Sequence, residues 1–148
     1  MKKTILIATL ATAAAAWILR PVTQAQSADE AGVRQTVGYY FQGHATGNGD
    51  FFKKAFHPEA KLFFIREGRF SQLTSEEYIA RATGKPASDE AQRKRSIESI
   101  DISGDAATAK IVLDYPSVRF TDYMSLLKID GEWKIVNKTF YANRKAGS

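Results

Sequence analysis

A tight turn between two apolar runs constrains the fold of this chain most strongly. Asp130 and Gly131 separate the runs "TDYMSLLKI" and "EWKIVNKTFYA". Both turn residues tolerate positive φ angles, which a two-residue type I′ hairpin requires. The sequence therefore predicts an antiparallel hairpin over residues 121–142. The predicted cross-strand pairs are Ile129 with Glu132, Leu126 with Ile135, Tyr123 with Lys138 and Asp122 with Thr139.

The alternation of the hairpin assigns its side chains to two faces, and both faces are partly apolar. We expect helices to cover one face and a second subunit to cover the other, which predicts a homodimer through the sheet. One predicted face carries Asp122, Met124, Leu126, Trp133, Ile135, Asn137 and Thr139, and the other carries Tyr123, Leu127, Val136, Lys138 and Phe140.

The chain before this hairpin reads as helices followed by strands. A helix from about Ala28 carries its buried residues at helical spacing and stops at "TGNG". Short helices follow at "FFKKAF", with Asp50 as its cap, and at "TSEEYIARA", with Thr74 or Ser75 as its cap. Strands are predicted at "AKLFFIRE", "SIESIDI" and "AATAKIVLDY". This order predicts an α+β domain with helices against one face of a curved antiparallel sheet.

Residues 1–25 have the pattern of a signal peptide. Lys2 and Lys3 precede the apolar stretch "TILIATLATAAAAWIL", and small residues before Gln26 suit cleavage near Ala25. The alternative is an uncleaved anchor, although the run is short and rich in Ala for a membrane span. We expect an exported protein, periplasmic or secreted, with one domain over residues 28–145 and no stable membrane insertion after leader removal.

The charge of the chain depends on this leader. The whole sequence has 21 basic and 16 acidic residues, a net charge of +5, and loss of the leader lowers the excess to +2. The cluster "RKR" at residues 93–95 has no interleaved aromatic residues, so it indicates a solvated loop rather than a nucleic-acid surface.

The absence of cysteine means that the core alone must hold the domain in an oxidising compartment. It also excludes thiolate metal sites and thiol nucleophiles. Nine Phe and six Tyr suit a packed core or an apolar pocket. With only His44, His57 and scattered carboxylates available, we predict no metal site and no cofactor.

Two residues of the first predicted helix are candidates for a ligand or catalytic site. Tyr40 and His44 share a helix face with Val33 and Val37, so both point toward the core or a cavity. His44 is either a half-buried core histidine or a pocket acid or base, and Tyr40 is either a core aromatic or a hydrogen-bond donor. Asp122 is either a general base in the cavity or an interface carboxylate.

The segments "YYFQGHATGNGDFFKKAFHPEA" and "IDISGDAATAKIVLDYPSVRFTDYMSLLKIDGEWKIVNKTFYA" resemble the nuclear transport factor 2-like superfamily. The resemblance is specifically to its lumazine-binding-like branch of small bacterial proteins. It implies a cone, also called cystatin-like or SnoaL-like, in which helices close a strongly curved sheet over a cavity and dimers form through the sheet. In ketosteroid-isomerase relatives a carboxylate base lies in the strand after the second helix, and Phe64 stands near that position here.

Three functions remain open, because one such cone serves enzymes, ligand carriers and structural partners. The first is binding of a small apolar or aromatic ligand. The second is an isomerase, dehydratase or cyclase that uses Tyr40, His44 and Asp122, and the third is a structural dimer with a filled cavity. The candidate ligand-binding residues are Tyr40, His44, Phe64, Arg66, Tyr123 and Lys138.

Overall fold

The computed structural model describes residues 20–146, with side chains from residue 26. Three α-helices and one 3-10 turn accompany a six-stranded sheet of order β2-β1-β6-β5-β4-β3, so the predicted α+β class is confirmed. The elements are α1 (Arg20–Thr46), α2 (Gly49–Ala55), β1 (Phe56–Arg66), β2 (Arg69–Thr74), α3 (Ser75–Ile79), η1 (Glu90–Gln92), β3 (Lys94–Ser103), β4 (Ala106–Asp114), β5 (Val118–Ile129) and β6 (Glu132–Arg144).

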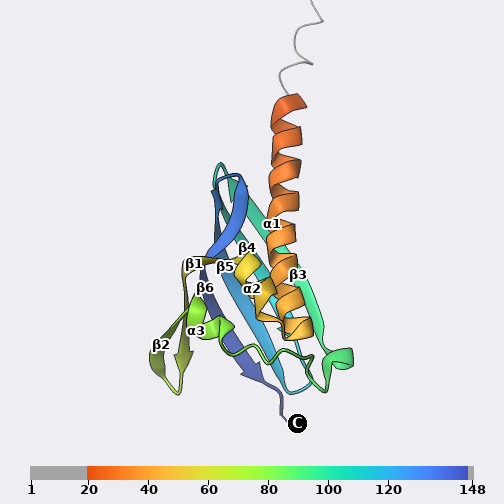
Figure 1. Ribbon diagram of the computed structural model, residues 1–148, viewed down its shortest axis with the longest axis vertical. Coiled ribbons are helices and arrows are strands. Elements are labelled where there is room, and N and C mark those ends of the chain that lie inside the picture. The colour runs from red at the N-terminus through yellow and green to blue at the C-terminus, as the bar shows by residue number, and fades with distance from the viewer. Residues whose placement is uncertain (1–19, 147–148) are drawn as a thin grey trace, which may run out of the picture.

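The helices lie together on one face of the sheet. Figure 1 shows α1 running along the length of this face, with its first turns projecting beyond the strands and α2 beside it. The short helix α3 lies on the other side of α2, next to β1 and β2. The sheet curves around these helices without closing, and neighbouring strands are antiparallel except β1 and β6, which are parallel. The helices and the curved sheet thus form the predicted cone.

The core fills the space between α1 and the sheet. Val33, Val37 and Tyr40 of α1 are fully buried, as their spacing predicted. They pack against alternate residues of the central strands, such as Leu62 and Leu126. Burial of these apolar side chains stabilises the domain in place of disulfides, because the chain has no cysteine.

The turn between β5 and β6 has the predicted conformation. Asp130 and Gly131 have φ angles of 51° and 83°, as a type I′ turn requires. Ile129 pairs with Glu132 and Leu126 pairs with Ile135, so the first half of the predicted register is confirmed.

A β-bulge in β6 shifts the second half of the hairpin by one residue. The register changes between Ser125 and Leu126, and Val136 opposes no residue of β5. Beyond the bulge Lys138 pairs with Met124, so the predicted pairs of Tyr123 with Lys138 and of Asp122 with Thr139 are wrong. The extra residue also moves Lys138 and Phe140 onto the helix-covered face.

Three local predictions also need correction. Asn48, not Asp50, caps α2, and its side chain accepts a hydrogen bond from the Asp50 amide at 2.9 Å. The strand β2 was not predicted, although the cap at Thr74 of the neighbouring helix α3 was. The second helix ends before the last residue of the predicted segment "FFKKAF", because α2 stops at Ala55 and Phe56 begins β1.

The predicted leader lies mostly outside the described residues, and its last six residues form the start of α1. Within residues 20–146, no helix combines the length and the apolar character that crossing a bilayer requires.

Candidate functional site

Asp122, Lys138 and Tyr40 form a polar centre inside the core, here called the buried centre. The ammonium of Lys138 donates to Oδ2 of Asp122 at 3.0 Å and to the Tyr40 hydroxyl at 2.9 Å. The Tyr40 hydroxyl in turn donates to the same Asp122 oxygen at 2.8 Å. Asp122 is fully buried and Lys138 is 4% exposed. Burying such a charged pair costs free energy, so the pair contributes little to the net stability of the fold. It is therefore a candidate for a functional site.

Two further side chains extend the buried centre toward the surface. The Tyr78 hydroxyl lies 3.3 Å from that of Tyr40 and 2.9 Å from Nε2 of His44. A chain of polar atoms therefore runs from Asp122 to partly buried His44. The His44 ring also meets the Tyr40 ring edge-on at a centroid distance of 4.7 Å.

Burial shifts the pKa values of Lys138, His44 and Tyr40 toward the neutral form of each side chain. Desolvation lowers the pKa of Lys138, although nearby Asp122 opposes the shift. Desolvation, reinforced by Lys138, Arg95 and Arg93, holds the pKa of His44 well below 6.5. Burial, together with the Asp122 carboxylate, raises the pKa of Tyr40 well above 10.

One oxygen of the buried centre is unsatisfied. Oδ2 of Asp122 accepts from both Lys138 and Tyr40, whereas no donor among the described residues reaches buried Oδ1. Buried polar atoms nearly always have a partner, so this acceptor suits an N–H or O–H group from water or a ligand.

A groove continues from the buried centre along the concave face of the sheet, where the helices no longer cover it. Its volume is about 710 Å³, within the usual range for small-molecule pockets. Phe64 and Phe140 stack at 4.9 Å in its floor, and Phe140 also contacts Phe120. We call it the concave groove, lined by Phe64, Ile65, Arg66, Glu67, Val118, Phe120, Phe140, Ala142 and Arg144.

Phe140 connects the concave groove with the buried centre. The Lys138 ammonium lies 4.4 Å from the centre of the Phe140 ring and 5.2 Å and 5.3 Å from those of Tyr40 and Tyr78. Three aromatic rings thus surround this cation. The cation–π interactions stabilise its positive charge, which burial disfavours.

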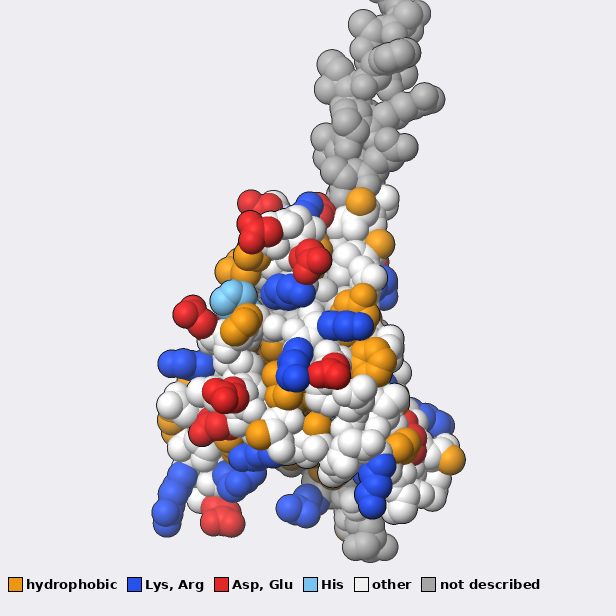
Figure 2. Space-filling view, viewed as in Figure 1, with side chains coloured by type: hydrophobic (Ala, Val, Ile, Leu, Met, Phe, Trp, Pro, Cys, Tyr) orange, Lys and Arg blue, Asp and Glu red, His pale blue; other side chains and the backbone are white. Residues whose placement is uncertain are grey.

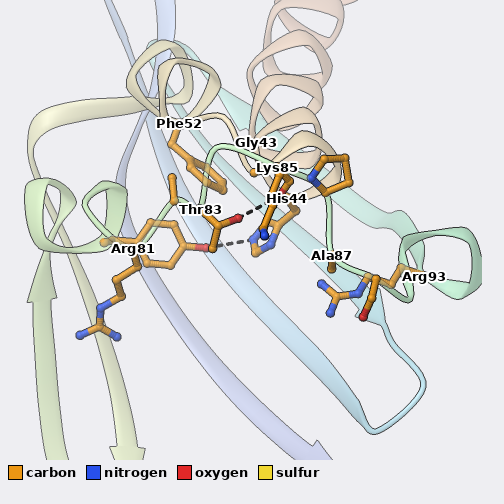
Figure 3. A pocket seen from close by; sticks show the side chains of 13 residues that line it. Gly43, His44, Phe52, Arg81, Thr83, Lys85, Ala87 and Arg93 are labelled. Carbon is orange, nitrogen blue, oxygen red and sulfur yellow. Dashed lines mark hydrogen bonds between the residues drawn. The ribbon is translucent and has the colours of Figure 1, made fainter.

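A second pocket, of about 610 Å³, opens between the end of α1, Phe52, Tyr78 and the segment 81–88. Figure 3 shows His44 among its lining side chains, with the hydrogen bond to Tyr78 as a dashed line. Arg81, Lys85 and Arg93 supply its charges. In Figure 2 acidic and basic side chains alternate over the helical face, and basic ones are frequent at its lower end.

The structure brings together most of the predicted site residues. Tyr40, Asp122 and Lys138 meet in the buried centre, His44 lines the second pocket, and Phe64 and Arg66 line the concave groove. Tyr123 does not join them, because it lies on the opposite face of the sheet and is 53% exposed.

Tyr78 and Phe140 were not among the predicted site residues. Tyr78 lies in α3 beside exposed Glu76 and Glu77, and the pair Tyr78-Ile79 marks the buried side of that short helix. Phe140 was assigned to the wrong face, because nothing in the local pattern of β6 identifies the bulge at Val136.

No three His, Asp or Glu side chains within the described part of the chain gather closely enough to hold a metal ion. The buried centre and its extension toward His44 offer a lysine, a carboxylate, two tyrosines and a histidine. These groups can bind a carbonyl or transfer protons.

A cone of this topology, with a polar centre and a concave groove, defines a nuclear transport factor 2-like protein. The chain belongs to the family described as "Putative lumazine-binding", whose model matches residues 28–141.

Solved structures share this fold. A nuclear transport factor 2-like protein of unknown function from Shewanella baltica is 24% identical, with a TM-score of 0.73 over 80% of this chain and 97% of its own. A similar protein from Silicibacter pomeroyi is 22% identical, with a TM-score of 0.71 over 80% and 98%. Among curated proteins, aldolase FrzH from Cladobotryum sp is 21% identical over 107 residues, 72% of this chain and 86% of that protein.

Proposed function

We propose that this protein binds a small, largely apolar or aromatic molecule in the concave groove. The observation that carries the proposal is the aromatic floor of Phe64, Phe140 and Phe120, which ends directly at the buried centre. The ligand stacks its apolar part on these rings, and Arg66 and Arg144 favour an anionic group at the rim.

Titration with lumazine, a flat aromatic with carbonyl groups, tests this function. We expect saturable binding by the full mature chain and an affinity loss of about tenfold in Phe140→Ala, because base-like rings gain about 1–3 kcal/mol from an aromatic platform. Phe70→Ala is the matched control, since Phe70 is 69% exposed and lies outside the concave groove. Equal affinity of Phe140→Ala and Phe70→Ala for lumazine would contradict binding at the groove. A mature protein that neither binds lumazine nor retains a co-purifying molecule in native mass spectrometry would also contradict it.

A second candidate function is catalysis on a carbonyl compound. The buried centre favours it, because Tyr40, Asp122 and Lys138 place a hydroxyl, a carboxylate and an amine within 3.0 Å of one another. The relative named as an aldolase supports the same chemistry. Loss of turnover in Asp122→Asn, with folding retained, would distinguish catalysis from binding once a substrate is known.

We also propose that the protein is exported and acts in the periplasm or outside the cell. The basic and apolar start of the sequence supports this proposal. Mass spectrometry of the protein from its own host should find a mature chain that begins near Gln26. A full-length chain that stays in the cytoplasmic fraction would contradict export.

The outer face of the sheet supports the proposal of a homodimer. Tyr123, Leu127 and Tyr141 are 53%, 41% and 68% exposed, although aromatic and aliphatic side chains favour burial. A second copy of the same face would cover them through a self-complementary contact.

A further inference from the structure

We propose that Lys138 is the amine that forms a covalent imine with an aldehyde or ketone bound in the concave groove. The inference rests on the proposed binding function and adds a reaction to it. It derives from three features of the structure, namely the position of the amine, its charged surroundings and the free oxygen of Asp122.

The position of the amine places it behind the groove floor. Lys138 and Phe140 project from the same face of β6, and the ammonium lies 4.4 Å from the Phe140 ring centre. Phe140 is only partly buried and lines the concave groove. The proposed reaction requires this one ring to rotate, so that a carbonyl carbon in the groove can reach Nζ.

The surroundings suit an iminium cation as well as they suit the ammonium. Asp122 lies 3.0 Å from Nζ, and the rings of Tyr40, Tyr78 and Phe140 face the same charge. Because the imine nitrogen retains the position and the positive charge of the ammonium, these interactions remain in the product. A neutral product would lose them.

The reaction balances without any other reagent. Lys138 transfers one proton to Asp122, and the free amine adds to the carbonyl carbon. One N–H proton of the adduct then moves to the former carbonyl oxygen, which gives a neutral intermediate with a hydroxyl group. Asp122 then returns the proton to this hydroxyl, which leaves as water, and the C=N bond forms. One ammonium and one carbonyl thus give one iminium and one water, with no change in charge or oxidation state.

Oδ1 of Asp122 has a role in this sequence. Because Oδ2 already accepts from Lys138 and Tyr40, unpartnered Oδ1 is the oxygen available to face the hydroxyl of the intermediate and, in protonated Asp122, to donate the proton with which that hydroxyl leaves as water. Burial also lowers the pKa of Lys138, which eases the first proton transfer.

Reductive trapping tests the inference on the full mature protein. The probe is 2-oxo-4-phenylbutanoate, whose ring fits the aromatic floor and whose carboxylate suits Arg66 and Arg144. With sodium cyanoborohydride at pH 7, we expect one adduct per chain, which peptide mapping locates at Lys138. Labelling there should be at least about tenfold faster than at exposed Lys61, because binding in the concave groove holds the carbonyl carbon near Nζ of Lys138, whereas Lys61 meets the probe only by collision.

Variants sharpen the test. Lys138→Arg keeps the positive charge beside Asp122 and should abolish the specific adduct. Phe140→Ala weakens binding, but at a probe concentration that saturates both proteins it should accelerate labelling of Lys138 by opening the path to Nζ. Phe70→Ala is again the control. Because the map of the wild-type protein locates the adduct directly, the result does not depend on folding of Lys138→Arg.

Binding of the probe, measured separately without reductant, distinguishes the two proposals. An adduct confined to Lys138 supports both. Saturable binding without an adduct at Lys138, or with labelling no faster than at Lys61, overturns the imine and leaves the binding function. If the protein neither binds a groove ligand nor is labelled at Lys138, the proposed binding function and the proposed imine are both overturned.

Discussion

The charges of Asp122 and Lys138 stabilise each other. Because both side chains are buried, water cannot take the place of either partner when the other is removed. Lys138→Met should reduce the free energy of unfolding by about 3–5 kcal/mol, since it leaves the Asp122 carboxylate buried and unpaired. Asp122→Leu with Lys138→Met should cost much less than the sum of the two single changes. Urea denaturation of the two single variants and the double variant measures this difference, and additive losses would show that the pair is not coupled.

His44 should make stability depend on pH, and the chain provides its own control because it has only two histidines. Its pKa is held well below 6.5 by burial and by the cations Lys138, Arg95 and Arg93. Below about pH 6.5 the unfolded chain binds a proton at this residue that the folded chain does not, so stability falls as the pH falls.

We therefore expect the wild-type free energy of unfolding to decrease between pH 7 and pH 5, by at most about 1.4 kcal/mol per pH unit from this residue. His44→Gln should flatten this dependence relative to both the wild-type protein and the comparison variant His57→Gln, in which His44 and its neighbouring cations remain. Denaturation curves at several pH values give the slopes. Equal slopes for all three proteins would assign the pH dependence to other groups.

Replacing each of two glycines in different elements with alanine should change the stability of the protein in opposite directions. Gly131 has a φ of +83° in the turn between β5 and β6, and an L-residue in that region costs about 1–2 kcal/mol. Gly38 lies inside α1, where an added Cβ meets nothing within 4 Å. Gly38→Ala should therefore stabilise the protein by about 1 kcal/mol, the difference in helix propensity.

Thermal unfolding of the two glycine variants checks both signs. A stabilised Gly131→Ala would show that this turn does not need the left-handed conformation. A destabilised Gly38→Ala would show that a neighbour approaches α1 more closely than the structure indicates.

The elements also show where sequence reasoning succeeds. The turn at Asp130 and Gly131 and the face of Tyr40 and His44 were predictable, because each depends on neighbours within one element. The bulge at Val136 was not, since β-bulges respond to the twist of the whole sheet. The buried centre was therefore only half predictable, with Tyr40 and Asp122 on the correct face and Lys138 on the wrong one.

At the scale of the whole molecule, the proposed homodimer should depend on the outer face of the sheet. Changing Tyr123 and Tyr141 to Glu together should convert a dimer to a monomer, because four carboxylates would be buried in a symmetric contact. Native mass spectrometry of the wild-type and variant proteins measures the change. Phe70→Glu, on β2, is the control, and a monomeric wild-type protein or a dimeric double variant would refute the interface.

The position of β6 between β1 and β5 has a consequence for biosynthesis. The ribosome makes β1 and β2 early, yet their link to the remaining strands is the parallel pairing of β1 with β6, which follows every other described strand. While β6 is still in the exit tunnel, β1 and β5 both present unpaired backbone edges, and Asp122 lacks its lysine. The nascent chain must therefore avoid aggregation with two open edges, and we expect the sheet to form only after synthesis of residues 132–144.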